Sequence, residues 1–342
     1  MEKNEIVPNI LILGKTGAGK TSLVQAVTHT GTVPDSAIGH AAPTTRGFQE
    51  YKTDAANFVD CEGMEPGQTV EQYFAFTNGE IVKRLDSNDP RKLIHVVWYC
   101  IDGSGGRVQS ADAKIVRKFS DKVLLVVTKS ELLRKDQVES LTGELLKLLP
   151  ESRIIMVSSH QETGLGQLLD KTRTIAADSI ACGEEELAEF RRRWEEYYGR
   201  MYAAWKRKTD EEADSFINWA AGRAAAIAIV PLPLADVGPL ILNEAYMIYR
   251  LGAVYGYVVN KTIFAMIAGV AGGSIAGKVL ASFLPALKIP IAAGITYGVG
   301  KAAKAFFESG MTLNKDELRK KFREEESKGK DREWKPIEEK EN

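Results

Sequence analysis

Short apolar runs alternate with segments of helical periodicity along the first half of the chain. The apolar runs predict six strands, at 9–13, 47–53, 55–60, 93–101, 122–128 and 153–158. Between them, apolar positions recur at helical spacing and predict helices at 20–28, 70–77, 110–119, 135–149 and 166–176. Strands that alternate with helices favour an α/β fold with a mostly parallel six-stranded sheet covered on both faces. The second and third strands have almost no connection, so we expect them to form an antiparallel hairpin with one antiparallel edge strand.

The pattern changes in the second half, where only helices are predicted. Aromatic residues recur at spacings of three and four between Trp194 and Trp205 in a charged segment. They predict an amphipathic connecting helix over 179–215, which either packs on a neighbour or docks a partner. Residues 216–310 are rich in Ala, Gly, Ile and Val, so we expect an all-α, Ala/Gly-rich hydrophobic helical domain. We assign 1–178 to the first domain and 311–342 to a charged C-terminal helix and tail.

The apolar half raises the question of membrane contact. Residues 262–277 are sixteen residues without a charge, fewer than the about 20 that a spanning helix needs. Their small residues would let helices approach closely. A tightly packed soluble bundle is one interpretation. The other is that residues 216–307 meet a membrane surface or a protein partner.

Two carboxylates, Asp236 and Glu244, fall within this apolar region. An unpaired carboxylate is costly in an apolar environment. We therefore expect both to be solvated, or paired with Arg223 or Arg250. A role in a gate or relay is the alternative.

Composition narrows the class of protein. A length of 342 residues, 44% of them hydrophobic, is enough for two domains with cores of their own. The net charge of −1 gives no general attraction to nucleic acid. Cys61, Cys100 and Cys182 form neither a zinc pattern nor a disulfide framework, and the first residues lack the apolar core of a signal peptide. We expect a cytoplasmic protein that can associate peripherally with a membrane.

Residues 14–21 read GKTGAGKT, a full match to G-x-x-x-x-G-K-[ST] between a predicted strand and a predicted helix. In this context the motif is typical of a phosphate-binding loop, whose backbone N–H groups surround an anion at the start of a helix. Lys20 would reach the β- and γ-phosphates, and the Thr21 hydroxyl would bind Mg²⁺. The predicted contacts to the nucleotide in this region are Gly14, Lys15, Thr16, Gly17, Ala18, Gly19, Lys20, Thr21 and Ser22.

The third predicted strand ends in D-x-x-G, at Asp60 and Gly63. Asp60 would hold Mg²⁺ through water, and the Gly63 amide would contact the γ-phosphate. The preceding loop needs a threonine whose hydroxyl reaches Mg²⁺ only when the γ-phosphate is present. Thr44 and Thr45 both fit, and we favour Thr45. The predicted metal ligands are therefore Thr21, Thr45 and Asp60.

Residues 128–131, reading TKSE, follow the fifth predicted strand, at the place of an N-K-x-D guanine motif. Lys129 would stack over the base, and the Glu131 carboxylate would accept hydrogen bonds from guanine N1–H and N2–H₂, which adenine lacks. Thr128 and Glu131 depart from the usual Asn and Asp, so an ATPase is the less favoured alternative. Ser158 and Ser159 follow the last strand, where a backbone amide would contact guanine O6.

These motifs, in this order, resemble the translation-factor-related GTPases of the Era/TrmE/septin-like branch. Residues 97–108 and 229–236 are similar to a bacterial and cyanobacterial subset in which the GTPase is fused to a hydrophobic helical domain of unassigned function. A weaker similarity runs to the interferon-inducible immunity GTPases. The resemblance implies hydrolysis of GTP to GDP and phosphate with Mg²⁺, as a switch for the helical domain. A nucleotide-controlled membrane or scaffold protein with slow hydrolysis is the alternative. Era's RNA-binding KH domain has no counterpart here, so we expect no nucleic-acid partner.

Catalysis by this chain would differ from that of Ras-like enzymes, which place Gln after D-x-x-G to orient the attacking water. Here that residue is Met64, so we expect slow turnover. Assistance would come from Arg46, Glu62 or a second protomer in a homodimer formed through the GTPase domain. Gly17 stands where TrmE-like enzymes use Asn for potassium activation, so we expect no potassium dependence. The predicted catalytic residues are Lys20, Thr45, Arg46 and Gly63.

Overall fold

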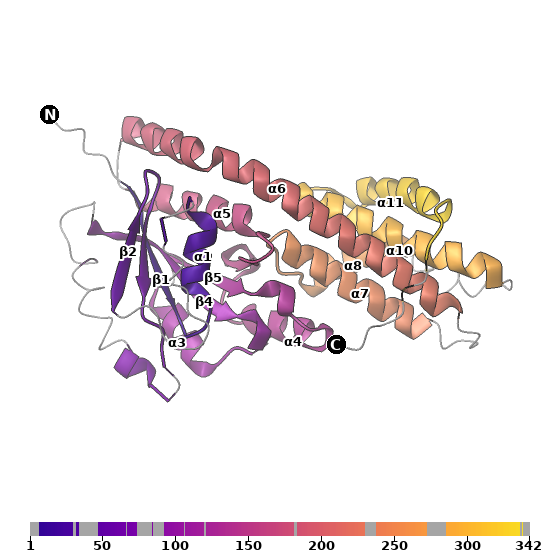
Figure 1. Ribbon diagram of the computed structural model, residues 1–342, viewed down its shortest axis with the longest axis horizontal. Coiled ribbons are helices and arrows are strands. Elements are labelled where there is room, and N and C mark those ends of the chain that lie inside the picture. Colours follow the sequence, from indigo (N-terminus) through magenta and orange to yellow (C-terminus); the bar gives the residue numbers. More distant parts are fainter. Residues whose placement is uncertain are drawn as a thin grey trace. The chain divides into compact units, whose positions relative to one another are not determined.

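The structure is a computed structural model that describes residues 7–29, 32–33, 47–65, 67–73, 84, 92–105, 107–119, 121–180, 183–229, 237–271, 285–335 and 337. It divides the chain into two compact units, Met1–Lys208 and Thr209–Asn342. Figure 1 shows that the strands belong to the first unit and that the second is built from helices.

The first unit contains one six-stranded sheet in the order β2-β3-β1-β4-β5-β6. Its strands are β1 (Asn9–Gly14), β2 (Phe48–Lys52), β3 (Asn57–Cys61), β4 (Ile94–Asp102), β5 (Val123–Thr128) and β6 (Ile154–Met156). The edge strand β2 pairs with β3 in the antiparallel direction, and the other pairs are parallel. The predicted sheet and its antiparallel hairpin are confirmed.

The helices of this unit follow the predicted alternation. They are α1 (Lys20–Val27), α3 (Ser110–Lys118), α4 (Lys135–Leu145) and α5 (Leu165–Ser179), with short 3₁₀ turns η3 (Gly103–Gly105), η4 (Ser130–Leu132) and η5 (Glu151–Arg153). The predicted helix at 70–77 is helical over 70–73, and its remaining residues lie outside the described part of the chain.

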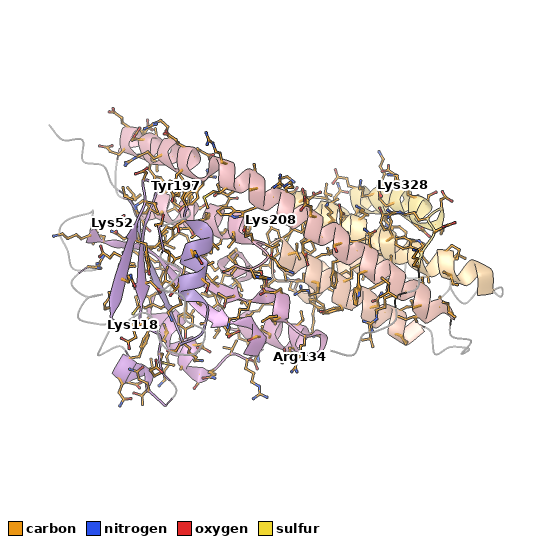
Figure 2. All side chains as sticks on the ribbon, in the orientation of Figure 1. Lys52, Lys118, Arg134, Tyr197, Lys208 and Lys328 are labelled. Atoms are coloured by element: carbon orange, nitrogen blue, oxygen red, sulfur yellow. The ribbon has the colours of Figure 1, made fainter. Side chains whose placement is uncertain are left out.

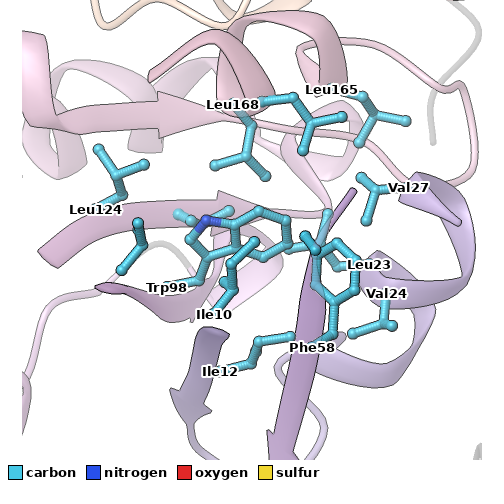
Figure 3. Packing of buried hydrophobic residues seen from close by; sticks show 14 of the residues in the cluster. Ile10, Ile12, Leu23, Val24, Val27, Phe58, Trp98, Leu124, Leu165 and Leu168 are labelled. Carbon is cyan, nitrogen blue, oxygen red and sulfur yellow. The ribbon is translucent and has the colours of Figure 1, made fainter. Parts of the chain in front are cut away.

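The core of the first unit surrounds Trp98 of β4 (Figure 3). Its ring lies 5.5 Å from that of Phe58 on β3, and its Nε1 donates a hydrogen bond to Thr172 Oγ1 of α5 at 2.9 Å. Ile10 of β1 and Leu23 of α1 are fully buried in the same cluster. Inner parallel strands are covered on both faces, which explains why β1 and β5 are apolar along their whole length. This packing fixes β1 against α1 and therefore fixes the loop between them.

The long helix α6 (Glu184–Ile229) continues past residue 215, at which the sequence predicts the end of a connecting helix. Its first part contributes buried aromatic residues, among them Trp194 and Tyr198, to the core of the first unit. Its last part contributes small apolar residues to the core of the second unit: Ala213, Ile217, Ala220, Ala221 and Ala224. The same helix thus contributes to both cores, with large aromatic side chains in its first part and mostly alanine in its last part.

The second unit contains the end of α6 together with α7 (Val237–Val254), α8 (Lys261–Ala268), the turn η6 (Gly269–Ala271), α10 (Pro285–Glu308) and α11 (Lys315–Lys330). Glycines let α10 and α11 approach closely. A Cβ atom on Gly294 would lie 2.6 Å from Cγ of Lys330, and one on Gly298 would lie 3.0 Å from Cβ of Glu326. The expected Ala/Gly-rich helical region is thus observed, and α11 packs as part of it. Within the described residues, no helix is both long enough and apolar enough to cross a bilayer.

Glu244 on α7 corrects one expectation. It is buried, and its carboxylate accepts a hydrogen bond from Thr296 Oγ1 of α10 at 3.2 Å. The expectation of a solvated or arginine-paired side chain is therefore wrong for Glu244, because the α7 and α10 contact buries it next to a hydroxyl. Burial raises the pKa of Glu244 from 4.5 to about 8, and the hydrogen bond from Thr296 only partly offsets this. Asp236 lies outside the described residues.

Candidate functional site

The phosphate-loop motif forms a tight turn between β1 and α1. Gly14 has φ 142°, and a Cβ atom there would lie 2.4 Å from the Cys100 carbonyl oxygen on β4. Gly17 and Gly19 also have positive φ, which explains why the turn needs glycine at these positions. The buried Lys20 folds back over the turn, and its Nζ donates to the carbonyl oxygens of Gly14 (3.2 Å) and Lys15 (3.1 Å). The loop therefore holds a buried cation at the start of a helix, as anion binding requires.

Two of the predicted metal ligands lie side by side. Thr21 Oγ1 donates to Asp60 Oδ2 at 2.6 Å, and Asp60 is fully buried at the end of β3. Hydroxyl and carboxylate oxygens are the donors that Mg²⁺ prefers, in sites it shares with phosphates and water. The donor set thus fits Mg²⁺. Thr45, with Thr44 and Arg46, lies outside the described residues.

The D-x-x-G segment packs directly against the phosphate loop. The Met64 N–H donates to the Gly14 carbonyl oxygen, and the Thr16 N–H donates to the Met64 carbonyl oxygen, both at 3.2 Å. A Cβ atom on Gly63 would lie 2.4 Å from the Thr16 nitrogen. Gly63 is therefore required for close backbone packing, in addition to its predicted contact with the γ-phosphate.

The substitution Gly63→Ala tests this packing. The added methyl group must push the D-x-x-G segment away from Thr16, so we expect GTP affinity to fall at least about 10-fold and GDP affinity to change by less than about 3-fold. Titration of fluorescent GTP and GDP analogues measures both constants. Gly143→Ala on α4, where an added Cβ has no atom within 4 Å, is the matched control. Equal losses for GTP and GDP would contradict the prediction.

Glu62, one of the residues that could assist catalysis, is hydrogen-bonded to the backbone at the start of β2. Its Oε2 accepts a hydrogen bond from the Gly47 N–H at 2.9 Å, and its own N–H donates to the Gly47 carbonyl oxygen at 2.9 Å. These two bonds anchor the beginning of β2 to the D-x-x-G segment. The carboxylate of Glu62 is thus engaged next to the loop that precedes β2.

A cavity of about 530 Å³ lies beside the phosphate loop, within the size range of ligand sites. Six of the predicted nucleotide contacts line it: Gly19, Ser22, Thr128, Lys129, Glu131 and Ser159. The sequence did not single out its other lining residues: Gln25, Ala26, Leu132, His160 and Glu162. The predicted base contacts at Thr128, Lys129, Glu131 and Ser159 therefore line one pocket next to the end of the phosphate loop.

Thr128 connects three segments around this pocket. Its Oγ1 lies within hydrogen-bond distance of the carbonyl oxygens of Ala18 (2.8 Å) and Ile101 (3.1 Å). The hydroxyl thus joins the end of β5 to the phosphate loop and to β4. The threonine that stands in place of asparagine thus links the predicted base-binding segment to the phosphate loop.

Lys129 has a fixed position at the edge of the pocket. Its backbone is left-handed (φ 53°), and its Nζ donates to the Gly17 carbonyl oxygen at 2.8 Å and to Asp102 Oδ2 at 2.7 Å. Burial disfavours ionisation of Asp102, but hydrogen bonds from Lys129 and Ser104 outweigh it and lower the pKa of Asp102. Asp102 is not among the site residues that the sequence motifs predict. Its position at the end of β4, in register with Thr128, was the available signal.

Glu131 and the loop after β6 complete the pocket. Glu131 Oε2 is buried and receives no hydrogen bond from the residues that the structure describes. Ser158 is buried, and its backbone exchanges two hydrogen bonds of 3.1 Å with Thr163, closing the loop that carries Ser159. A buried carboxylate oxygen that no described residue bonds thus belongs to a side chain that lines this pocket.

Helix α6 contacts the pocket at Glu162 and the segment just after α1 at His29. Lys208 Nζ lies 2.6 Å from Oε1 of Glu162, which lines the pocket. The His29 N–H, two residues beyond α1, donates to Tyr197 Oη at 3.2 Å. Tyr197 and Lys208 lie along α6 (Figure 2).

Comparisons with known proteins found a family model, a relative and a solved structure that are similar to parts of this chain. Residues 9–159 match the family model of the 50S ribosome-binding GTPase. The chain is 30% identical over 126 residues to magnetosome membrane protein 22 of Magnetospirillum gryphiswaldense, a match that covers 31% of this chain and 65% of that protein. The chain thus spans just under two thirds of the length of this relative. A crystal structure of an Aquifex aeolicus Era variant bound to GDP·AlF₄⁻ is similar at 24% identity and a TM-score of 0.37, over 52% of this chain and 58% of that one.

The family match ends at the loop after β6 and begins at β1, so it contains the whole sheet and each predicted nucleotide motif. The sheet order and the phosphate-loop motif agree with this family match. Residues 9–159 thus have the α/β fold of a P-loop GTPase domain.

Proposed function

We propose that this protein binds GTP together with Mg²⁺ and hydrolyses it to GDP and phosphate. The observation that carries the proposal is the convergence of three groups on one site. These are the buried Lys20, the Thr21 and Asp60 pair at 2.6 Å, and the pocket that Thr128 ties to the phosphate loop. The family match over residues 9–159 supports the same nucleotide class.

Each group has a defined part in the proposed reaction. Lys20 and the backbone N–H groups of the loop hold the phosphates, and Thr21 with Asp60 holds Mg²⁺ directly or through water. Bound Mg²⁺ would neutralise charge that develops on the phosphates. Thr45 and Arg46 stay proposed as the switch threonine and an assisting cation.

Calorimetry and phosphate release test the proposal. The full chain is titrated with GTP, GDP and ATP in the presence of Mg²⁺, and phosphate release is followed with and without potassium and over a range of protein concentrations. Binding of GTP and GDP, release of phosphate from GTP, and no stimulation by potassium are expected. Faster turnover per molecule at higher concentration would support a homodimer through the GTPase domain. No binding of any nucleotide would overturn the proposal.

Base selection by Glu131 provides a sharper test. Its carboxylate is proposed to accept the N1–H and N2–H₂ donors of guanine, so Glu131→Ala is expected to lower GTP affinity by about 10- to 100-fold and leave weak ATP binding within about 3-fold. Competition against a fluorescent GDP analogue measures both affinities. Glu139→Ala, on the exposed face of α4, is the control. A variant that keeps its preference for GTP would contradict the role of Glu131.

We further propose that α6 links nucleotide state to the helical unit. The support is local to the first unit: α6 holds Glu162 of the base pocket through Lys208 and receives the His29 N–H through Tyr197. His29 lies directly ahead of the segment in which the switch threonine is expected. A change in either segment on nucleotide binding would therefore alter contacts of α6.

A second candidate function is nucleotide-controlled membrane association. Ile241 and Leu242, adjacent on α7, are 49% and 57% exposed and present apolar surface to solvent. The name of magnetosome membrane protein 22 points in the same direction for that relative. Flotation with liposomes in the presence of GTP, GDP or no nucleotide decides between the two. Flotation that depends on nucleotide favours the membrane function, and its absence in every state favours a switch that acts on a protein partner.

A further inference from the structure

The proposed hydrolysis lacks a group that orients water at the usual place. Met64, the residue directly after D-x-x-G, is only 6% exposed and has no side-chain oxygen or nitrogen. Glu62 is held by the Gly47 N–H at the start of β2. Met64 therefore cannot orient a water molecule by hydrogen bonding, and one carboxylate oxygen of Glu62 is already engaged by the backbone.

The next residue, Glu65, is turned toward the phosphate loop. Its Oε1 accepts a hydrogen bond from Thr16 Oγ1 at 2.8 Å. Its backbone is fixed as well, because its N–H donates to Gln68 Oε1 and the Gln68 N–H donates to its carbonyl oxygen, both at 3.1 Å. Glu65 thus has a defined side-chain position rather than a free rotamer.

Thr16 marks the γ-phosphate end of the site. It lies against Gly63, whose amide is the predicted γ-phosphate contact, and its own N–H bonds the Met64 carbonyl oxygen. The base pocket adjoins the other side of the loop, at Gly19 and Thr128. A side chain that Thr16 holds is therefore on the hydrolytic side of the nucleotide and not on the base side.

We propose that Glu65 orients the attacking water in GTP hydrolysis and that Thr16 positions Glu65 for this role. This inference rests on the proposed GTPase activity. The Glu65 carboxylate accepts a hydrogen bond from the water, whose oxygen forms a bond to the γ-phosphorus. The bond between that phosphorus and the β–γ bridging oxygen breaks, and its electron pair stays on GDP. The water's proton passes to the released phosphate. A carboxylate can replace glutamine here because the step needs a hydrogen-bond acceptor at a fixed position.

Single-turnover hydrolysis of GTP by the full chain, measured together with GTP and GDP affinities, tests the proposal. Glu65→Ala is expected to slow hydrolysis at least about 10-fold with affinities within about 3-fold, and Glu65→Gln, which keeps an acceptor, to retain most of the rate. Glu71→Ala removes an exposed carboxylate of the same segment and is expected to leave the rate unchanged.

The role of Thr16 requires a double-mutant cycle. Thr16→Val keeps the shape but removes the donor, so it is expected to slow hydrolysis severalfold at saturating GTP. The double variant Thr16→Val with Glu65→Ala is expected to be no slower than Glu65→Ala alone. Additive effects would overturn the positioning role.

Two outcomes with Glu65→Ala would overturn its catalytic role: an unchanged rate, or a loss of nucleotide binding equal to the loss of rate. A wild-type chain that binds GTP but releases no phosphate would instead overturn the proposed hydrolysis and this inference with it. The wild-type measurement therefore separates the two failures.

Discussion

Replacing Lys20 by methionine is expected to weaken GTP binding by roughly 100- to 1,000-fold, the equivalent of about 3–4 kcal/mol. The Lys20 ammonium group is buried over the phosphate loop, where its Nζ already meets two backbone carbonyl oxygens. A phosphate that enters the loop meets a cation shielded from water, which makes the charge-assisted hydrogen bond strong. Methionine keeps most of the length and apolar contact of the side chain but has no charge.

The measurement is equilibrium binding of a fluorescent GTP analogue, with thermal unfolding of the nucleotide-free protein alongside. The melting temperature of the free protein should change little, because methionine fits a buried position. Lys147→Met, at an exposed position just beyond α4, removes one positive charge from the same unit and serves as the control. A variant at Lys20 that binds GTP within about 3-fold of wild type would refute the assignment of the phosphate site.

The substitution Glu244→Gln is expected to stabilise the helical unit by roughly 3–5 kcal/mol at about pH 9. Burial raises the pKa of Glu244 from 4.5 to about 8. A raised pKa in the folded state means that the folded protein binds the proton more tightly than the unfolded chain. The contribution of the Glu244 carboxyl group to the free energy of unfolding is therefore fully present below about pH 4.5. It is lost progressively as the pH rises to about 8. Glutamine keeps an oxygen that can accept the Thr296 hydrogen bond and removes the cost of a buried charge.

The stabilisation caused by Glu244→Gln should shrink to about 1 kcal/mol near pH 5. At that pH the wild-type carboxyl group is protonated in the folded state and partly ionised in the unfolded chain. Urea unfolding at the two pH values measures the free energies of unfolding, and hydrogen exchange of α7 and α10 amides assigns the effect to the second unit. Glu324→Gln on α11 removes an exposed carboxylate and is the control. A gain that is the same at both pH values would show that the charge of Glu244 is not its cause.

Local sequence patterns were sufficient for the phosphate side of the site. The glycines of the loop, Lys20 and Thr21 belong to one short motif whose geometry depends on backbone sterics and on the helix that follows. Asp60 could be placed near Thr21 because the strand before the phosphate loop and the strand that carries Asp60 are parallel and end at the same edge of the sheet. The contact of 2.6 Å between these two residues agrees with that reasoning.

Contacts between segments that are distant along the chain could not be predicted from the sequence. Asp102 became a partner of Lys129 only because β4 and β5 are paired in register. Glu65 reached Thr16 through the packing of two turns that are far apart along the chain. No periodicity or spacing specifies such contacts, since each is set by the position of a whole strand or turn.

The sequence by itself determined the order of strands and helices, the chemistry of the phosphate loop and the character of the two halves, because these follow from short-range sterics and apolar periodicity. Only the tertiary structure decided that α6 continues through the predicted domain boundary, that Glu244 is buried beside Thr296, and that Gly294 and Gly298 bring α10 against α11. These outcomes depend on which surfaces meet, and that is a property of the packed chain as a whole.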